Sequence, residues 1–184
     1  MNLADAALVV IDMQNGFVND RSRHVIPVVV SLVAGWERAG GDILFTRYLN
    51  YPGSQYERLM QWSALQGSPE IDIVDELVPY ARRARAIIDK TIYTMFTCEG
   101  RSIVRDGGWT DLVFCGIATE SCVLKSAVDA FELGYTPWVV RDASASHDGE
   151  VTHQAGLLVA GRFIGANQLI DTATLTVKLL PASA

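Results

Sequence analysis

Three residues in this chain supply the groups that covalent hydrolysis needs, namely a thiol, a carboxylate and an ammonium. Cys122 is a candidate nucleophile, Asp12 a candidate base and Lys90 a candidate cation. A cysteine attacks as its thiolate, so it needs a group that takes its proton and a charge that stabilises the anion. Asp12 could take the proton and return it to a leaving group, while Lys90 could hold the anion. The trio therefore predicts a covalent hydrolytic mechanism.

Each member of the trio follows a segment with the pattern of a buried parallel strand. The apolar run AALVVI ends directly at Asp12, and its β-branched residues favour a strand buried on both faces. Two further predicted strands, 85–89 and 111–115, precede Lys90 and the turn that leads to Cys122. In open α/β sheets the ligand crevice lies beyond the carboxyl ends of the strands. Residues far apart in the sequence could therefore meet at one edge of the sheet.

The turn after residues 111–115 is expected to lead into a helix that activates the thiol. If Thr119 caps this helix, Cys122 occupies its third position, where the helix dipole and unpaired amide N–H groups favour a thiolate. The same amides could stabilise an oxyanion. Cys115 lies inside the apolar strand and is expected to be inert, and Cys98 is expected to be structural.

Strand-like and helix-like segments alternate along the whole chain. Strands are expected at 6–11, 43–46, 85–89, 111–115, 136–140 and 168–170, and helices at 26–39, 100–106, 120–133 and 150–164. Residues 49–69 are expected to be irregular, with a short helix around 56–59. The order predicts a three-layer α/β/α fold with a six-stranded, mainly parallel, Rossmann-like sheet. Without a linker or an internal repeat, residues 1–184 are expected to form a single domain.

The composition restricts the partners of this chain. Its 184 residues include 15 Lys and Arg against 21 Asp and Glu, a net charge of −6, so no nucleic-acid partner is expected. No apolar run approaches the length of about 18 residues that suggests a membrane span, and we expect no signal peptide. Three cysteines, an odd and low number, are typical of a reducing compartment, so we expect a cytoplasmic protein. The mean hydropathy of +0.19 favours a homo-oligomer.

Three segments of the sequence resemble the signatures of the isochorismatase-like cysteine hydrolases. They are VVIDMQNGF at 9–17, Asp89-Lys90, and GIATESCV at 116–123. The segment DASASH at 142–147 and the helix around His153 are similar to the next segments of that family. The resemblance extends from about residue 6 to residue 175. The first and third signatures are specific in combination, although each would be weak alone.

The resemblance implies a six-stranded parallel sheet and a catalytic triad of Asp12, Lys90 and Cys122. It also implies a cis peptide bond between Ile117 and Ala118 that turns the Ala118 N–H toward the substrate. The oxyanion hole would then consist of the backbone amides of Ala118 and Cys122. Residues near these signatures are expected to form the substrate pocket: Gln14, Phe17, Tyr48, Tyr93 and Thr119.

One segment departs from part of the family. In the nicotinamidase branch of the family, the resemblance implies an Asp-x-His pattern after the second strand, and this pattern binds a divalent metal. This chain has TRYLNY at 46–51 there, with neither Asp nor His. We therefore expect no metal and no other cofactor, and we do not expect nicotinamide as the substrate. The tyrosines of the 48–69 segment could form a substrate lid or a subunit contact, and an ordinary surface loop is an equal alternative. The three histidines are expected to be surface and capping residues.

The hypothesis that fits these features is hydrolysis of a C–N bond in a small amide, carbamoyl or ureido compound through a thioester. The partner would then be a small-molecule substrate. Two alternatives remain open: vinyl-ether hydrolysis of the isochorismatase type, and a catalytically inactive binding homologue. Nucleotide binding is disfavoured because no Gly-x-Gly-x-x-Gly motif follows the first strand.

Overall fold

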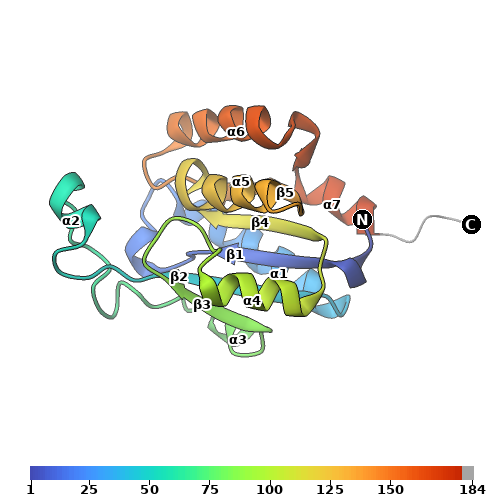
Figure 1. Cartoon of the computed structure of the whole chain (residues 1–184), viewed down its shortest axis with the longest axis horizontal. Helices are drawn as coiled ribbons and strands as arrows, with labels where there is room; N and C mark the ends of the chain where they lie inside the picture. Colours follow the sequence, from blue (N-terminus) through green and yellow to red (C-terminus); the bar gives the residue numbers. More distant parts are fainter. Residues whose placement is uncertain (180–184) are drawn as a thin grey trace, which may run out of the picture.

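A computed structural model of the protein describes residues 1–179, and its six strands form one parallel sheet (Figure 1). The strand order is β3-β2-β1-β4-β5-β6, and every pair of neighbours is parallel. The strands are β1 (Ala6–Ile11), β2 (Asp42–Tyr48), β3 (Ala86–Lys90), β4 (Asp111–Ile117), β5 (Thr136–Ala145) and β6 (Leu169–Ile170). This arrangement confirms the predicted α/β fold class.

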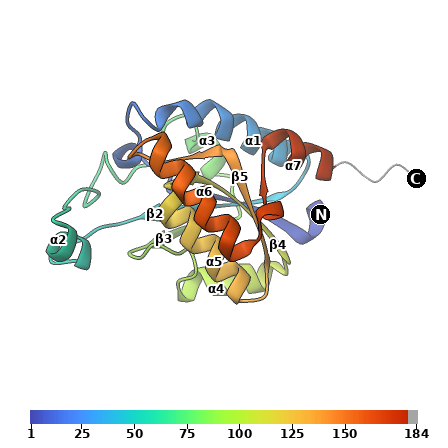
Figure 2. The same ribbon diagram turned by 90° about the horizontal axis from the view of Figure 1, so that it is seen from above.

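Helices cover both faces of the sheet, which makes three layers (Figures 1 and 2). One face carries α1 (Ile26–Arg38), α3 (Val78–Ala81) and α7 (Thr172–Leu179), and the other carries α4 (Cys98–Gly107), α5 (Leu124–Glu132) and α6 (Glu150–Ile164). Helix α2 (Gln55–Met60) stands away from the sheet at one end of the molecule. Short turns of 3-10 helix occur at Leu3–Asp5, Asn15–Phe17, Arg23–Val25 and Ala166–Gln168.

The apolar run of β1 forms the centre of the sheet. All six of its residues are fully buried. Alternate side chains point to opposite faces, so Leu8 and Val10 pack in the cluster with α1, while Val9 and Ile11 pack in the cluster with α4, α5 and α6. Burial of each such side chain contributes about 1.5–3 kcal/mol, which explains why a continuous apolar run was the clearest strand signal.

The ends of the helices follow local signals, whereas two short helices were not predicted. Pro27 stands in the first turn of α1, and Gly40 follows that helix with a φ of 81°. Thr97 caps α4 by accepting the N–H of Gly100. Helices α3 and α7 escaped prediction because they are short and are ordered mainly by packing against the sheet. Residues 55–60 are helical, close to the predicted short helix.

The sheet reverses its winding direction between β1 and β4, and this switch point is where ligands bind in such sheets. The two strands lie side by side, with Ile11 opposite Gly116. Gly116 has a φ of 114°, and a Cβ atom there would lie 2.1 Å from the Ile11 carbonyl oxygen. Only glycine fits this position, so the glycine of the GIATESCV segment allows the two strand ends to meet. Strand β5 continues to Ala145, five residues beyond its predicted end, past a register shift between Phe114 and Gly116.

Within residues 1–179, no helix combines the length and the apolar character that crossing a membrane requires.

Candidate active site

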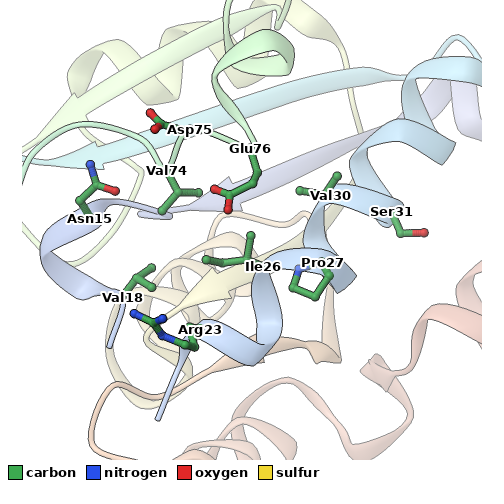
Figure 3. A pocket seen from close by; sticks show the side chains of 10 residues that line it. All are labelled: Asn15, Val18, Arg23, Ile26, Pro27, Val30, Ser31, Val74, Asp75 and Glu76. Carbon is green, nitrogen blue, oxygen red and sulfur yellow. The ribbon is translucent and has the colours of Figure 1, made fainter. Parts of the chain in front are cut away.

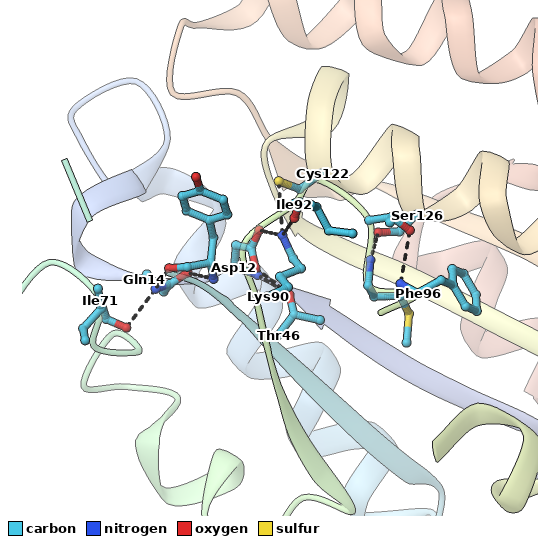
Figure 4. A network of polar contacts seen from close by, with 12 residues as sticks. Asp12, Gln14, Thr46, Ile71, Lys90, Ile92, Phe96, Cys122 and Ser126 are labelled. Atoms are coloured by element: carbon cyan, nitrogen blue, oxygen red, sulfur yellow. Dashed lines mark hydrogen bonds and ion pairs between the residues drawn. The ribbon is translucent and has the colours of Figure 1, made fainter. Parts of the chain in front are cut away.

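The structure brings Asp12, Lys90 and Cys122 together at the carboxyl edge of the sheet (Figure 4). The Lys90 Nζ donates to Asp12 Oδ2 at 2.6 Å and lies 3.5 Å from Cys122 Sγ. It also donates to the Ile92 carbonyl at 3.1 Å. The side chains of Lys90 and Asp12 are fully buried, and Cys122 is only 5% exposed. Lys90 is the last residue of β3, whereas the sequence placed it just after the strand. Its ammonium therefore bridges the carboxylate and the thiol.

Asp12 is held in place by Thr46 on the neighbouring strand β2. The Asp12 backbone has a φ of 45°, its N–H donates to Thr46 Oγ1 at 3.1 Å, and that hydroxyl donates to Asp12 Oδ1 at 2.6 Å. One carboxylate oxygen thus binds Thr46 and the other binds Lys90. Thr46 received no role in the sequence analysis, because nothing in a single strand indicates which residue lies beside the end of the next strand.

The turn that carries Cys122 differs from the predicted helix start. Thr119–Val123 (η4) forms one turn of π-helix ahead of α5, and no side chain caps it. Thr119 is not the cap, because its hydroxyl pairs with His153 Nδ1 at 2.7 Å. The Ile117–Ala118 peptide bond is cis, as the resemblance implies. Single turns of π-helix are frequently found at functional sites, and this one places the thiol beside Lys90.

Burial raises the pKa of the Cys122 thiol well above its ordinary value, and the nearby Asp12 carboxylate adds to the rise while Lys90 opposes it. This corrects the expectation that the helix start keeps Cys122 as a thiolate, because desolvation outweighs the cation. Burial alone would lower the pKa of Lys90, but Asp12 and Cys122 outweigh burial and raise it. Burial therefore favours the protonated form of the Cys122 thiol beside the ion pair of Lys90 and Asp12.

The other two cysteines lie outside this network. Cys115 is completely buried in β4, as predicted, and burial raises the pKa of its thiol. Cys98 is exposed at the first residue of α4, so the expectation of a structural role for it was wrong.

A cleft of about 310 Å³ opens directly above Cys122. Its walls are mostly aromatic, and part of them comes from the irregular 49–69 segment. The residues that line it are Phe17, Tyr48, Tyr56, Met60, Trp62, Tyr93, Ala118, Glu120, Ser121, Cys122, His147 and Asp148. The rings contact one another in series, with centroids 5.1 Å apart for Tyr48 and Tyr56 and 5.2 Å apart for Tyr56 and Tyr93. The segment thus builds a wall of the cleft.

The expected pocket residues divide into two groups. Phe17, Tyr48 and Tyr93 line the cleft. Gln14 and Thr119 do not: Gln14 is fully buried, where its amide group donates to the Tyr48 and Ile71 carbonyls and accepts the Tyr48 N–H. Gln14 therefore links Ile71, in the long connection after β2, to Tyr48 at the end of that strand.

Several residues of the cleft were missed by the sequence analysis. Trp62, Glu120, His147 and Asp148 all line it. Glu120 and His147 lie inside segments that resemble the family, but neither was assigned to the pocket. His147 was expected at the surface, but its ring stacks on Phe17 with centroids 5.6 Å apart. His153 is buried, whereas the histidines were expected to be surface and capping residues.

A second, wider cavity of about 710 Å³ lies beside the start of α1 (Figure 3). Charged side chains at its walls include Arg23, Asp75 and Glu76. Asp12, Lys90 and Cys122 are not among the residues that line it, so we place the candidate active site at the smaller cleft.

The residues after β2 do not fit a metal site. Among residues 1–179, no group of three or more His, Cys, Asp or Glu side chains is arranged to hold a metal ion. Asn50, which lies in this segment, uses its amide to donate to the carbonyls of Trp62 and Ala64. No step is therefore assigned to a metal.

The fold and the site define an α/β protein whose ligand crevice holds a thiol beside a buried ion pair. The model of the isochorismatase domain matches residues 6–168, and the chain belongs to the isochorismatase family. Two of the relatives that it matches are named as a nicotinamidase and an amidohydrolase, and a third is named as a probable inactive nicotinamidase of Arabidopsis thaliana. The chain is 26% identical to nicotinamidase 3 of Arabidopsis thaliana, over 95% of this chain and 89% of that protein. It is 28% identical to ureidoacrylate amidohydrolase RutB of Pseudomonas syringae pv. syringae (strain B728a), over 93% of this chain and 83% of that protein.

Solved structures share the fold. An isochorismatase-like hydrolase from Alkaliphilus metalliredigens superposes with a TM-score of 0.80 at 22% identity, over 95% of this chain and 98% of that chain. N-carbamoylsarcosine amidase from Thermoplasma acidophilum superposes with a TM-score of 0.74 at 24% identity, over 85% and 93% of the two chains.

Proposed function

We propose that this protein is a cysteine-dependent hydrolase that cleaves the C–N bond of a small amide, carbamoyl or ureido compound through a thioester. The observation that carries the proposal is the Lys90 Nζ, which lies 2.6 Å from Asp12 Oδ2 and 3.5 Å from Cys122 Sγ at the floor of the cleft. Relatives named as a nicotinamidase, an amidohydrolase and an amidase support C–N cleavage.

Proton transfer to Asp12 accompanies the first step. The Cys122 Sγ bonds to the carbonyl carbon while the thiol proton passes to Asp12, because the raised pKa of Cys122 keeps the thiol protonated until then. Lys90 stabilises the negative charge on sulfur as it develops. The C–N bond then breaks, and the leaving nitrogen takes the proton from Asp12. Water next attacks the thioester with Asp12 as the base, which releases the acid and restores the thiol.

The oxyanion would form beside the backbone amides of Ala118 and Cys122, which belong to residues lining the cleft. Donors aimed at the developing charge typically contribute 10²–10³ in rate. The cis peptide preceding Ala118 turns its N–H as the resemblance implies.

The test is hydrolysis of a panel of small amides and ureido compounds, measured as released ammonia or amine. Cys122→Ala should abolish turnover without lowering the melting temperature, and intact-mass measurement should detect an acyl adduct that this variant lacks. Cys98→Ser is the matched control and should retain activity, because Cys98 is exposed and remote from the network. Turnover that survives Cys122→Ala would refute the proposal. Binding of panel compounds by the wild-type protein without hydrolysis of any of them would instead favour an inactive binding homologue.

The remaining expectations are part of the same proposal. The partner is a small molecule, and neither nucleic acid nor a membrane takes part. A homo-oligomer and a cytoplasmic location, expected from hydropathy and cysteine content, stay predictions that size-exclusion chromatography and fractionation can test.

A further inference from the structure

The Asp, Glu, Lys and Arg side chains that line the cleft are all acidic. Glu120 and Asp148 line it, and none of the described residues that line it is a lysine or an arginine. Lys90 lies below the floor with its charge paired to Asp12. Arg21 is exposed outside the cleft, where it donates to the Asp148 carbonyl at 3.0 Å. A ligand in the cleft therefore meets carboxylates without a free cation to balance them.

Two buried polar atoms at the cleft lack partners. Glu120 Oε1 accepts the Ser146 hydroxyl at 2.9 Å, but its Oε2 is buried without a hydrogen bond from any described residue. The same holds for His147 Nδ1. Leaving a buried carboxylate oxygen without a hydrogen-bond donor costs folding free energy, and this cost is larger than for a neutral acceptor. Both residues line the cleft, so a positive charge on a ligand there would stabilise the Glu120 carboxylate.

Aromatic side chains form a wall of the same cleft. Trp62 and Phe17 are stacked with centroids 5.9 Å apart, and the Trp62 and Tyr56 centroids are 6.2 Å apart. Such rings attract cations through their negative faces. The wall already shows this behaviour, since the Lys90 Nζ lies 5.4 Å from the centroid of Tyr48.

We propose that the cleft selects amides that carry a protonated amine, with Glu120 as the residue that determines this specificity. The ammonium would lie beside the Glu120 carboxylate and rest against the Tyr56 and Trp62 rings while the amide carbonyl faces Cys122. Substrates with a free carboxylate are rejected, because the lining residues supply acids and no cation. This specificity rests on the proposed amidase function, but it is tested separately by binding.

The binding test uses the full chain and three probes of one shape: benzylamine, which is an ammonium at neutral pH, benzyl alcohol and benzoate. Isothermal titration should give at least about tenfold tighter binding of benzylamine than of benzyl alcohol, within the range expected for a desolvated cation–π and ion-pair contact. Benzoate should bind least. Glu120→Gln retains an acceptor for Ser146 and should remove the preference for the cation. Glu99→Gln changes the same charge at an exposed residue that does not line the cleft and should keep the preference.

The hydrolysis test compares 4-(aminomethyl)benzamide, 4-(hydroxymethyl)benzamide and 4-carboxybenzamide by ammonia release. The cationic amide should have the highest kcat/KM, and Glu120→Gln should equalise the first two. Equal binding of the amine and the alcohol, tighter binding of benzoate, or a preference that Glu120→Gln leaves intact would overturn the specificity. Selective binding of benzylamine without hydrolysis of any amide would instead support the cation site and refute only the proposed amidase function.

Discussion

Replacement of Lys90 by methionine tests the central contact of the proposed site. Lys90 Nζ lies 3.5 Å from Cys122 Sγ, and at an effective dielectric constant of about 20 two unit charges at that distance attract by about 5 kcal/mol. Rearrangement of solvent and side chains around the new methionine would offset part of this attraction. If only about 1.4 kcal/mol remains, the thiolate fraction of Cys122 falls about tenfold at any given pH. Lys90→Met should therefore slow alkylation of Cys122 at least about tenfold and move its pH profile upward.

The assay is the rate of iodoacetamide labelling of Cys122 against pH, followed by peptide mass. A Cys98→Ser background is needed because the exposed Cys98 also reacts. Cys115 reports unfolding, since its thiol is completely buried in the native core. Lys125→Met is the matched control, because it removes a lysine whose partner is Asp129 and not the thiol.

Asp12→Asn should have the opposite electrostatic effect. Removal of a negative charge beside the thiol lowers the pKa of Cys122, so alkylation should stay as fast or become faster, while turnover falls by about 10²–10⁴ because the general base is lost. The result that would refute the Lys90→Met prediction is alkylation of Cys122 at the wild-type rate in that variant while Cys115 stays unlabelled. The Lys90 ammonium would then not stabilise the thiolate, and the proposed triad would be wrong.

Three further predictions concern the surroundings of the site. Thr46→Val removes the hydroxyl that donates to Asp12 at 2.6 Å, so kcat should fall about tenfold with KM nearly unchanged. Thr46→Ser should restore kcat. A change in KM alone would contradict the positioning role of Thr46. Gly156→Ala would place a Cβ 2.7 Å from the Glu120 Cα; this should destabilise the protein by about 1–3 kcal/mol in thermal or urea denaturation, whereas Gly161→Ala, with its nearest contact at 3.4 Å, should cost less. Prolonged treatment with EDTA should leave activity intact, and a loss that zinc or manganese restores would reveal a metal site.

The local pattern of the chain was enough to predict the layered fold and most of the strands. A run buried on both faces has to be continuously apolar, and a parallel sheet requires helical crossovers, so β1 and the alternation of strands and helices could be recognised without any contact information. The proximity of Asp12, Lys90 and Cys122 was also predictable, since all three stand at the carboxyl ends of strands. The extension of β5 was not, because it depends on a register shift against β4.

The sequence by itself determined the fold class, the family and the three residues Asp12, Lys90 and Cys122. Each of these depends on short segments whose residue types are tightly constrained. The tertiary structure alone decided the environment of those groups. Burial raises the pKa of the Cys122 thiol where its place in the chain indicated a lowered one, and Thr46 proved to be the partner of Asp12. The aromatic and acidic lining of the cleft was equally hidden, because Trp62, Glu120 and His147 come from segments that meet only when the sheet and its long excursion pack together.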